Sequence, residues 1–445
     1  MKILILGGNA AGMSAAGRLL RRAPKTKVVV VEKSGEVSYG ACGLPYYVGG
    51  LNQDLDLMRI RSAEAFRAQG IDLRLFHCVK EVDFSQREAV IQAADGCYRE
   101  AFDQLLIATG SSAILPPLPG IALPGVYTLK TLADGAALQA ALALEENRQV
   151  AIVGGGYIGL ELAEACLRLH KQIRLFEAQE RLLSGFDPEF SEAAAEELRE
   201  HGVSLQLGEA IERIEAHNGQ KTLHTPKGSY PADVVIFAIG VRPNTAFLAG
   251  SPLDMLRNGA IVTNAQMQTS VAGVYAAGDC ATVMHRLLQK PAYLPLGTNA
   301  NKQGRFAADA MLGRPYAGYR GALGTAMLRC VQLELAKTGL TESEARQAGI
   351  DAASVTVTAP SHAPYYTQPL PIPITIKLCF KRGDGQLLGA QLMGRGESAQ
   401  RINVFACAID GGMTTAQLGA ADLGYAPPFS SVWDAIHIAA NAAKP

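Results

Sequence analysis

One strand–turn–helix–strand pattern occurs twice in this chain, and this repetition constrains the fold more than any other feature. In the first copy, a strand, a glycine-containing turn, a helix and a second strand are expected at residues 2–6, 7–12, 13–22 and 27–31. In the second copy, the same elements are expected at residues 149–153, 154–159, 160–170 and 172–176. Strands this apolar are typical of a parallel sheet that helices cover on both faces. The repeat therefore predicts an α/β protein with two Rossmann-like domains.

The glycines of both turns have the spacing found where a backbone approaches a pyrophosphate. Gly154, Gly156 and Gly159 complete the G-x-G-x-x-G pattern, whereas Gly7 and Gly12 flank an asparagine in the middle position. Such glycines also occur in turns that bind nothing. Here each turn follows a strand and precedes a helix, where a phosphate would rest on the helix N-terminus. The sequence therefore predicts two dinucleotide-binding sites.

An acidic residue stands at the end of the strand that follows each turn. Glu32 and Glu177 are expected to accept hydrogen bonds from ribose hydroxyl groups. A 2′-phosphate would meet the carboxylate of Glu177, so the sequence favours NADH over NADPH, and Arg181 is the nearby cation that would oppose this preference.

Cys42 has no second cysteine close to it in the sequence. Its oxidised form is therefore a mixed disulfide with a small thiol, a persulfide or a sulfenic acid. A free cysteine is more often a small buried apolar residue, and that interpretation suits the other cysteines of the chain. Together with two dinucleotide sites, Cys42 suggests that electrons pass from a nicotinamide through a flavin to one sulfur.

The composition excludes several classes of protein. Lys plus Arg and Asp plus Glu number 41 each, so no basic surface for nucleic acid or an anionic membrane is expected. The eight cysteines are scattered without metal-ligand spacing, which predicts reduced thiols, no metal site and a cytoplasmic location. No apolar run is long enough to span a bilayer. After about residue 321, alternating strands (355–358 and 372–380) and helices (398–410 and beyond 430) predict a separate α+β domain.

Several motifs in a fixed order resemble the FAD-dependent pyridine nucleotide–disulfide oxidoreductases. Besides the two turns, these motifs are 108–110 (Ala-Thr-Gly), 240–244 (Gly-Val-Arg-Pro-Asn) and 278–279 (Gly-Asp). The resemblance implies an FAD-binding domain at 1–112 and 245–320, an NAD(P)H-binding domain at 113–244 and a dimerisation domain at 321–445. It also implies that the following residues bind the two cofactors: Gly7, Ala11, Gly12, Glu32, Lys33, Val79, Ala108, Thr109, Gly110, Gly154, Gly156, Tyr157, Ile158, Gly159, Glu177, Gly240, Gly278, Asp279, Leu296, Gly297 and Thr298.

Within this family, the cysteine motif is similar to that of the coenzyme A disulfide reductases and the related CoA-persulfide or polysulfide reductases. Members with two redox cysteines have the second one at the position of Tyr47. NADH peroxidases and many NADH oxidases have a histidine at the position of Ala10. In the CoA-disulfide enzymes, two tyrosines reach the cysteine of the partner subunit. The resemblance assigns that catalytic role to Tyr365 and Tyr425, in a homodimer with shared active sites, although buried interface aromatics would have the same pattern.

The same resemblance places CoA along the first helix and beside the cysteine. The matching positions are Ser14, Arg18, Arg21, Arg22 and Ser38. Guanidinium groups bind phosphate well, but basic residues also suit the C-terminal end of any helix. Ala41 and Trp433 stand where some CoA-binding members have asparagine and lysine.

The sequence therefore predicts an FAD enzyme that uses NADH, with NADPH as the alternative, to reduce CoA disulfide or a CoA-linked or free polysulfide. Cys42 is expected to be a thiolate of lowered pKa, held by the flavin and a helix N-terminus. Two alternatives stay open. One is an NADH oxidase that reduces oxygen at the flavin, and the other is a flavin electron carrier or redox sensor.

Overall fold

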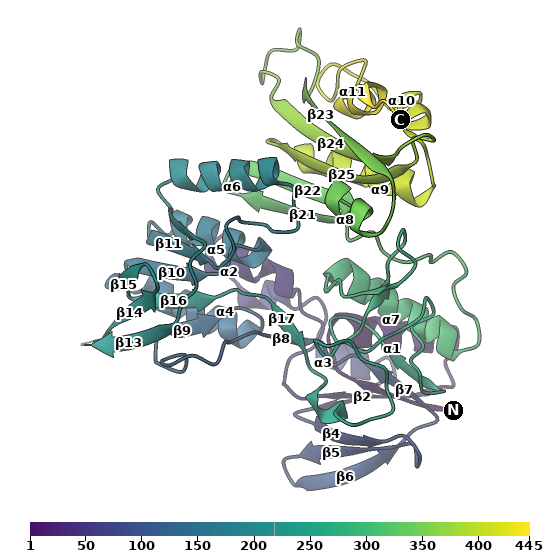
Figure 1. Cartoon of the computed structure of the whole chain (residues 1–445). Coiled ribbons are helices and arrows are strands. Elements are labelled where there is room, and N and C mark those ends of the chain that lie inside the picture. The colour runs from purple at the N-terminus through teal and green to yellow at the C-terminus, as the bar shows by residue number, and fades with distance from the viewer. Residues whose placement is uncertain (218) are drawn as a thin grey trace.

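The structure is a computed structural model, and it describes residues 1–217 and 219–445. Three five-stranded sheets organise these residues. Figure 1 shows the sheet nearest the N-terminus at the lower right, the second at the left and the third at the top. Among the described residues, no helix is both long enough and apolar enough to cross a membrane.

The first sheet is entirely parallel, with the order β18-β7-β1-β2-β3. Its strands are β1 (Lys2–Leu6), β2 (Lys27–Glu32), β3 (Asp72–Leu75), β7 (Gln104–Ile107) and β18 (Val274–Ala276). The helices of this region are α1 (Ala10–Arg22), α3 (Ala63–Arg67) and α7 (Gly297–Met311). A small antiparallel sheet of β4 (Cys78–Asp83), β5 (Glu88–Ala93) and β6 (Gly96–Ala101) lies below it in Figure 1. Helices α1 and α7 touch closely, because a Cβ atom at Gly304 would lie 2.1 Å from the carbonyl oxygen of Ala11.

The second sheet repeats the parallel arrangement, with the order β12-β11-β10-β16-β9. Its strands are β9 (Val126–Thr128), β10 (Gln149–Val153), β11 (Gln172–Glu177), β12 (Ser204–Leu207) and β16 (Val234–Phe237). The helices here are α4 (Leu132–Ala143), α5 (Tyr157–Arg168) and α6 (Pro188–Glu200). An antiparallel sheet again accompanies it, formed by β13 (Arg213–His217), β14 (Gln220–Thr225) and β15 (Gly228–Ala232). We call the first parallel sheet with its helices the first module, and the second parallel sheet with its helices the second module. Strands β8 (Ser111–Ala113) and β17 (Val241–Pro243) pair where the chain crosses between these two modules.

The third sheet is antiparallel, with the order β21-β22-β25-β24-β23. Its strands are β21 (Ala326–Cys330), β22 (Leu333–Gly339), β23 (Ala352–Pro360), β24 (Pro373–Lys381) and β25 (Leu387–Gly394). The helices are α8 (Glu342–Gln347), α9 (Ile402–Asp410), α10 (Thr415–Gly419) and α11 (Ala435–Ala442). A short pair, β19 (Val283–Met284) with β20 (Pro291–Ala292), precedes this domain.

The segment that carries Cys42, residues 41–48, packs against the second module. Cys42 lies in the 3-10 turn η1 (Ala41–Gly43), which runs directly into α2 (Leu44–Val48). Leu44 and Val48 belong to the apolar core of the second module. At Gly49, a Cβ atom would lie 2.9 Å from the Cα atom of Ala165 on α5. The cysteine is therefore held where the two modules meet.

The predicted fold class is confirmed, and the differences concern element ends. Helix α1 begins at Ala10 and α5 at Tyr157, three residues earlier than the sequence suggested in each case. The reason is that the turn residues accept the first helical hydrogen bonds, from Met13 N to Asn9 O and from Leu160 N to Gly156 O. The helix expected at 398–410 begins as the 3-10 turn η4 (Ser398–Arg401). Neither small antiparallel sheet was foreseen.

Candidate active site

The first glycine turn is closed by contacts that leave no room for side chains. Gly7 has a φ of +114°, and a Cβ atom there would lie 2.1 Å from the carbonyl oxygen of Ala108. A Cβ atom at Gly12 would lie 1.9 Å from the carbonyl oxygen of Gly7. Asn9, in the middle position, has a φ of −108° and accepts a hydrogen bond from Tyr39 N at 3.1 Å. The asparagine is tolerated because this position does not use the left-handed region that favours glycine.

Glu32 ends β2 beside this turn. One carboxylate oxygen accepts a hydrogen bond from Gly8 N at 2.8 Å, and the other accepts bonds from Ser34 N and Oγ at 2.9 Å each. A carboxylate has about four acceptor sites, so capacity for a ribose hydroxyl remains. The predicted position of Glu32 at the end of a strand next to the turn is thus confirmed, while its cofactor role stays a prediction.

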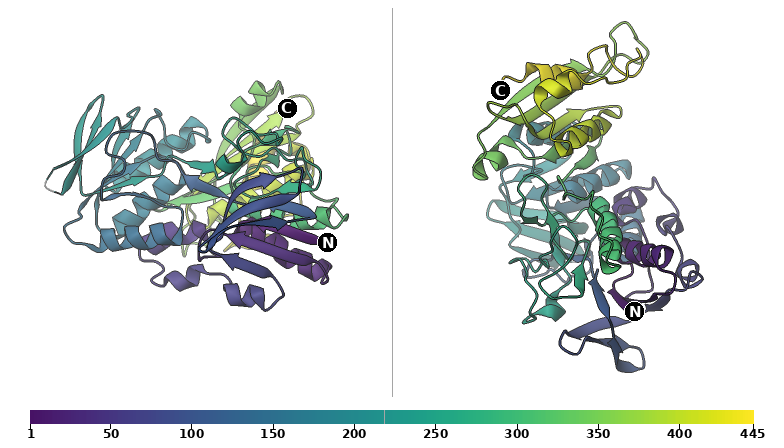
Figure 2. Two further views of the ribbon diagram at one scale, coloured as in Figure 1. Left: turned by 90° about the horizontal axis from the view of Figure 1, so that it is seen from below. Right: turned by 90° about the vertical axis from the view of Figure 1, so that its right-hand side faces the viewer.

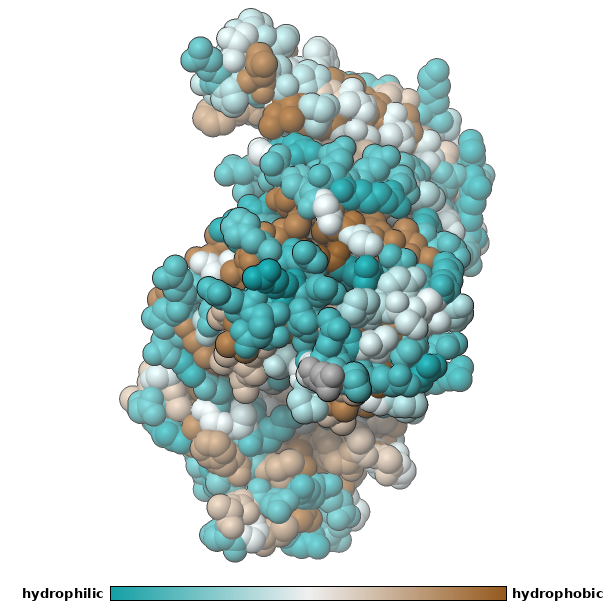
Figure 3. Space-filling model, turned by 90° about the vertical axis from the view of Figure 1, so that its left-hand side faces the viewer, coloured by the Kyte–Doolittle hydropathy of each residue, from teal (hydrophilic) through white to brown (hydrophobic). Residues whose placement is uncertain are grey.

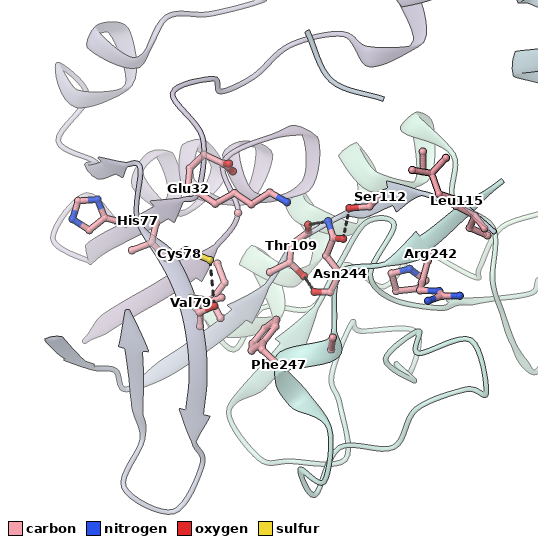
Figure 4. A pocket seen from close by; sticks show the side chains of 18 residues that line it. Glu32, His77, Cys78, Val79, Thr109, Ser112, Leu115, Arg242, Asn244 and Phe247 are labelled. Carbon is pink, nitrogen blue, oxygen red and sulfur yellow. Dashed lines mark hydrogen bonds between the residues drawn. The ribbon is translucent and has the colours of Figure 1, made fainter. Parts of the chain in front are cut away.

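A cavity of about 520 Å³ opens beside Glu32 and contains several of the predicted FAD residues. Figure 4 shows Glu32, Cys78 and Val79 on one side and Thr109 and Asn244 on the other. The predicted residues among its lining are Gly7, Glu32, Lys33, Val79 and Thr109. Its size and mixed apolar and polar lining are typical of a cofactor pocket. These residues fit the adenosine end of FAD. On the other side, the lining includes residues 242–244 of the 240–244 motif, which sequence reasoning did not place in this cavity. It missed residues 112–115, Ala246 and Phe247 altogether, because they form no motif.

The second glycine turn repeats the first in its contacts. A Cβ atom at Gly159 would lie 1.9 Å from the carbonyl oxygen of Gly154, whereas one at Gly156 would meet no atom within 4 Å. Glu177 accepts hydrogen bonds from Gly155 N at 2.7 Å and from Gln179 N at 2.8 Å. The structure thus leaves open space beside Gly156 and places the Glu177 carboxylate next to the turn, while their roles toward a pyrophosphate and a ribose stay predictions.

Asp279 follows β18 and faces two donors. Its Oδ2 atom accepts hydrogen bonds from Ser111 Oγ at 2.8 Å and from Lys130 Nζ at 2.9 Å. In the described part of the chain, nothing donates a hydrogen bond to the Oδ1 atom of Asp279, so this oxygen can accept one from a ligand hydroxyl. Lys130 comes from the second module and was not predicted to take part.

The thiol of Cys42 faces the start of α7. A Cβ atom at Gly297 would lie 3.7 Å from Cys42 Sγ, so the predicted flavin residues 296–298 and the cysteine are brought together. Burial raises the pKa of the Cys42 thiol, the negative charge of Glu161 raises it further, and Lys130 lowers it. The protein alone therefore does not provide the lowered pKa that the sequence led us to expect. Residue Cys42 nevertheless remains exposed.

Two acids on α5 approach the cysteine segment, and sequence reasoning missed both. Tyr46 Oη donates a hydrogen bond to Glu161 at 3.4 Å, and Arg329 on β21 pairs with Glu164 at 2.7 Å. Burial and the charge of Glu164 raise the pKa of Glu161 to about 7. The available signal was a pair of acids spaced i, i+3 on a helix whose other residues are mostly apolar.

The two predicted tyrosines meet each other but not the cysteine of their own chain. The hydroxyl groups of Tyr365 and Tyr425 are hydrogen-bonded, and this bond raises the pKa of Tyr425. Their loops lie at the far end of the C-terminal domain (Figures 1 and 2), and Figure 1 shows this end well separated from α2. Figure 3 shows apolar side chains on this projecting end. Exposed apolar side chains of these loops include Leu370, Phe429 and Trp433.

Of the predicted CoA residues on α1, some are bonded to α7 and others are more exposed. Arg18 donates two hydrogen bonds to Asp309 on α7, at 2.9 and 2.8 Å, and Ser14 donates one to Asn301 at 2.8 Å. Arg22 lies 3.7 Å from Asp309, and Arg21 has no ion pair with any described residue. The structure thus gives Arg18 a bridging position between α1 and α7, and the more exposed cations are Arg21 and Arg22. Ser38, near the cysteine, adopts a φ of +50°.

No group of three or more potential metal ligands occurs among residues 1–217 and 219–445.

Comparison with known proteins decides the family. Residues 1–304 match the pyridine nucleotide-disulphide oxidoreductases, and residues 327–436 match the dimerisation domain of that family. The chain belongs to this family. It is therefore an NAD(P)H-dependent flavoprotein oxidoreductase with a domain for homodimerisation.

Relatives of this oxidoreductase fall into two activity groups. It is 36% identical over 443 residues to an NAD(P)H sulfur oxidoreductase (CoA-dependent) of Pyrococcus abyssi, covering 99% of this chain and 98% of that protein. It is 32% identical over 451 residues to an NADH oxidase of Enterococcus faecalis, covering 100% and 99%. The solved structure of a water-forming NADH oxidase from Lactobacillus brevis bound to NADH has a TM-score of 0.95 at 31% identity, covering 99% and 98%. Similarity alone does not separate sulfur reduction from oxygen reduction.

Proposed function

We infer that this oxidoreductase uses NAD(P)H to reduce a disulfide, persulfide or polysulfide linked to CoA, through a mixed disulfide between Cys42 and the small thiol. The observation that carries this inference is the position of an exposed, unpaired thiol at the junction of the two nucleotide-binding modules, facing the start of α7. Because α2 is anchored in the core of the second module, the sulfur is held in a fixed place between the two cofactor sites.

The chemistry of the sulfur is a thiol–disulfide exchange. The Cys42 thiolate attacks one sulfur of RS–SR′, the S–S bond breaks, and R′S⁻ leaves while Cys42–S–S–R forms. Two electrons and one proton then release RSH and restore the Cys42 thiolate. FAD, when bound, supplies the route by which a hydride from NAD(P)H becomes two electrons at the sulfur.

The residues around the sulfur would serve the proton requirements of this exchange. Burial raises the pKa of the Cys42 thiol, and the positive charge of Lys130 offsets part of that rise, which favours the attacking thiolate. The departing thiolate needs a proton or a hydrogen bond, which a neutral phenol can give at pH 7. Tyr425, with Tyr365 beside it, would supply that bond to the cysteine of the partner subunit. The first turn and the 520 Å³ cavity would hold FAD, and the second turn would hold the nicotinamide nucleotide.

The second candidate function is an NADH oxidase. It is favoured by the similarity of 32% to the Enterococcus faecalis enzyme, which is close to that of the sulfur oxidoreductase. Alanine at position 10 and the pair of exposed tyrosine hydroxyls favour sulfur reduction instead.

The decisive experiment compares wild type with Cys42→Ser in three assays. Reduction of an artificial dye should persist in the variant, because hydride transfer to the flavin needs no sulfur. Turnover of CoA disulfide and of CoA persulfide should fall to background. Undiminished turnover of both sulfur substrates would rule out the inferred function, and rapid NADH-dependent oxygen uptake by wild type without sulfur turnover would establish the oxidase.

A further inference from the structure

One arginine contacts both of the loops that carry the tyrosines. Arg401 stands at the N-terminal end of α9, and its Nη2 atom donates to the carbonyl oxygen of Ser361 at 2.8 Å and to that of Phe429 at 3.0 Å. Ser361 precedes Tyr365 by four residues, and Phe429 follows Tyr425 by four residues. A single guanidinium nitrogen therefore hydrogen-bonds to two segments that are far apart in the sequence.

The guanidinium also binds a carboxylate. Arg401 Nε donates to the two carboxylate oxygens of Asp434 at 3.4 and 3.2 Å. Asp434 is fixed in turn, because its Oδ1 atom accepts a hydrogen bond from Ile436 N at 2.9 Å and caps α11. The side chains of Arg401 and Asp434 are only 18% and 10% exposed. The contact is thus a buried part of the domain, unlike the exposed phenols above it.

The loop of Tyr365 has no other described side-chain link to the loop of Tyr425 at its base. A backbone hydrogen bond from Ala363 N to the carbonyl oxygen of Pro427, at 3.4 Å, is long. The buried His362 stabilises its own loop only, since its Nε2 atom bonds to the carbonyl oxygens of Tyr366 and Pro369 at 3.2 and 3.1 Å. Figure 2 shows the two loops side by side at one end of the domain. Among the described residues, Arg401 is therefore the side chain that hydrogen-bonds to both loops at their base.

We propose that Arg401, held by Asp434, is a positioning residue that brings the hydroxyl groups of Tyr365 and Tyr425 together for their work on the sulfur. This proposal rests on the function inferred above for the tyrosines. Arginine suits the task because its planar fork can serve a carboxylate and two carbonyl oxygens at once, whereas lysine offers one compact ammonium.

The test uses the full-length, FAD-loaded dimer with three variants. Arg401→Gln removes the charge and most donors, Arg401→Lys keeps the charge without the fork, and Asp434→Asn keeps an acceptor for Ile436 N while weakening the ion pair. Arg286→Gln is the matched control. Arg286 binds Asp410 at the other end of α9 through Nε at 3.0 Å and its carbonyl oxygen through Nη2 at 3.1 Å, and it contacts neither tyrosine loop.

The first readout reports the spacing of the phenols without reference to activity. Photo-oxidation with a ruthenium complex and persulfate removes two electrons and two protons from a pair of adjacent tyrosines and joins their rings. The Tyr365–Tyr425 product, identified by mass spectrometry of peptides and absent in Tyr425→Phe, should form in wild type and in Arg286→Gln. Its yield should fall at least fivefold in Arg401→Gln and in Asp434→Asn, with an intermediate yield in Arg401→Lys.

The second readout is turnover of CoA disulfide compared with dye reduction. The rate of CoA-disulfide turnover should be about tenfold or more lower in Arg401→Gln than in wild type, while its rate of dye reduction stays unchanged. The disulfide turnover of Arg401→Lys should lie between those of Arg401→Gln and wild type. An unchanged cross-link yield in dimeric Arg401→Gln, or in Asp434→Asn if the first variant does not dimerise, would overturn the proposal. A reduced yield with full disulfide turnover would leave the positioning role intact and would instead refute the catalytic role of the tyrosines.

Discussion

Cys42 shares its surroundings with a carboxyl group that changes charge near neutral pH. Burial, and then the charge of Glu164, raise the pKa of Glu161 to about 7, and the charge of Glu161 in turn raises the pKa of the Cys42 thiol. Below pH 7, Glu161 is mostly neutral and opposes the thiolate little. Above pH 7 it becomes an anion next to a forming thiolate, which is the unfavourable arrangement of two like charges.

Replacing Glu161 by Gln should therefore make Cys42 more reactive in a pH-dependent way. We expect the rate of iodoacetamide alkylation of Cys42 to rise severalfold at pH 8.5 and to change little at pH 6, since only the charged carboxylate is being removed. The measurement is mass spectrometry of the Cys42 peptide over time. Glu192→Gln, which removes an acid paired with Arg199 on the surface of α6, is the control. A rate for Glu161→Gln equal to that of wild type at pH 8.5 would contradict this coupling.

The turn between β10 and α5 is the element in which we expect the preference between NADH and NADPH to be set. Glu177 accepts a hydrogen bond from Gly155 N, so its carboxylate lies next to this turn. We expect kcat/KM for NADH to exceed that for NADPH by about tenfold or more, because a 2′-phosphate would lie against this carboxylate. The Glu177→Gln variant retains an acceptor for Gly155 N but lacks the charge. It should therefore lower the ratio of kcat/KM for NADH to that for NADPH, mainly by raising kcat/KM for NADPH. A clear NADPH preference in wild type would show that Arg181 or another cation dominates.

The βαβ elements could be predicted from the sequence because their determinants are local. Glycine spacing, a buried Val-rich strand and an acid at its end specify the turn, so Glu32 and Glu177 were placed correctly at the ends of β2 and β11. The start of α1 was missed by three residues, since capping depends on backbone bonds that the pattern does not encode, whereas its end at Arg22 was predicted correctly. Glu161 was overlooked because its raised pKa arises from α5 packing against α2. Packing between segments that are distant in the sequence leaves no periodic pattern of residues from which it could be predicted.

The tyrosines show the same limit at the level of whole domains. Their identity was suggested by a family motif, but the contact between Tyr365 and Tyr425, and the arginine beneath them, come from the folding of β23, β24 and the segment before α11. In one chain, the segments that carry these tyrosines, after β23 and before α11, lie away from α2 (Figure 1). The exposed apolar residues around them, and the exposed Leu57 and Ile60 near the cysteine segment, offer surface that a dimer can bury.

A whole-molecule prediction follows from this separation: each active site needs two chains. Co-expressing a Cys42→Ser chain with a Tyr425→Phe chain, each with its own tag, gives heterodimers in which one site has both Cys42 and Tyr425 in trans. These heterodimers should have about half of the wild-type disulfide turnover, while Tyr425→Phe homodimers should be slowed by roughly 10² because they lack one proton donor. The reciprocal control pairs a wild-type chain with a Cys42→Ser/Tyr425→Phe double variant. Its only Cys42 then faces Phe at position 425 of the other chain. Turnover per dimer should therefore be about half of that of the Tyr425→Phe homodimer, which has two such sites. If this control is instead the active one, Tyr425 acts within its own chain, and the shared site is refuted.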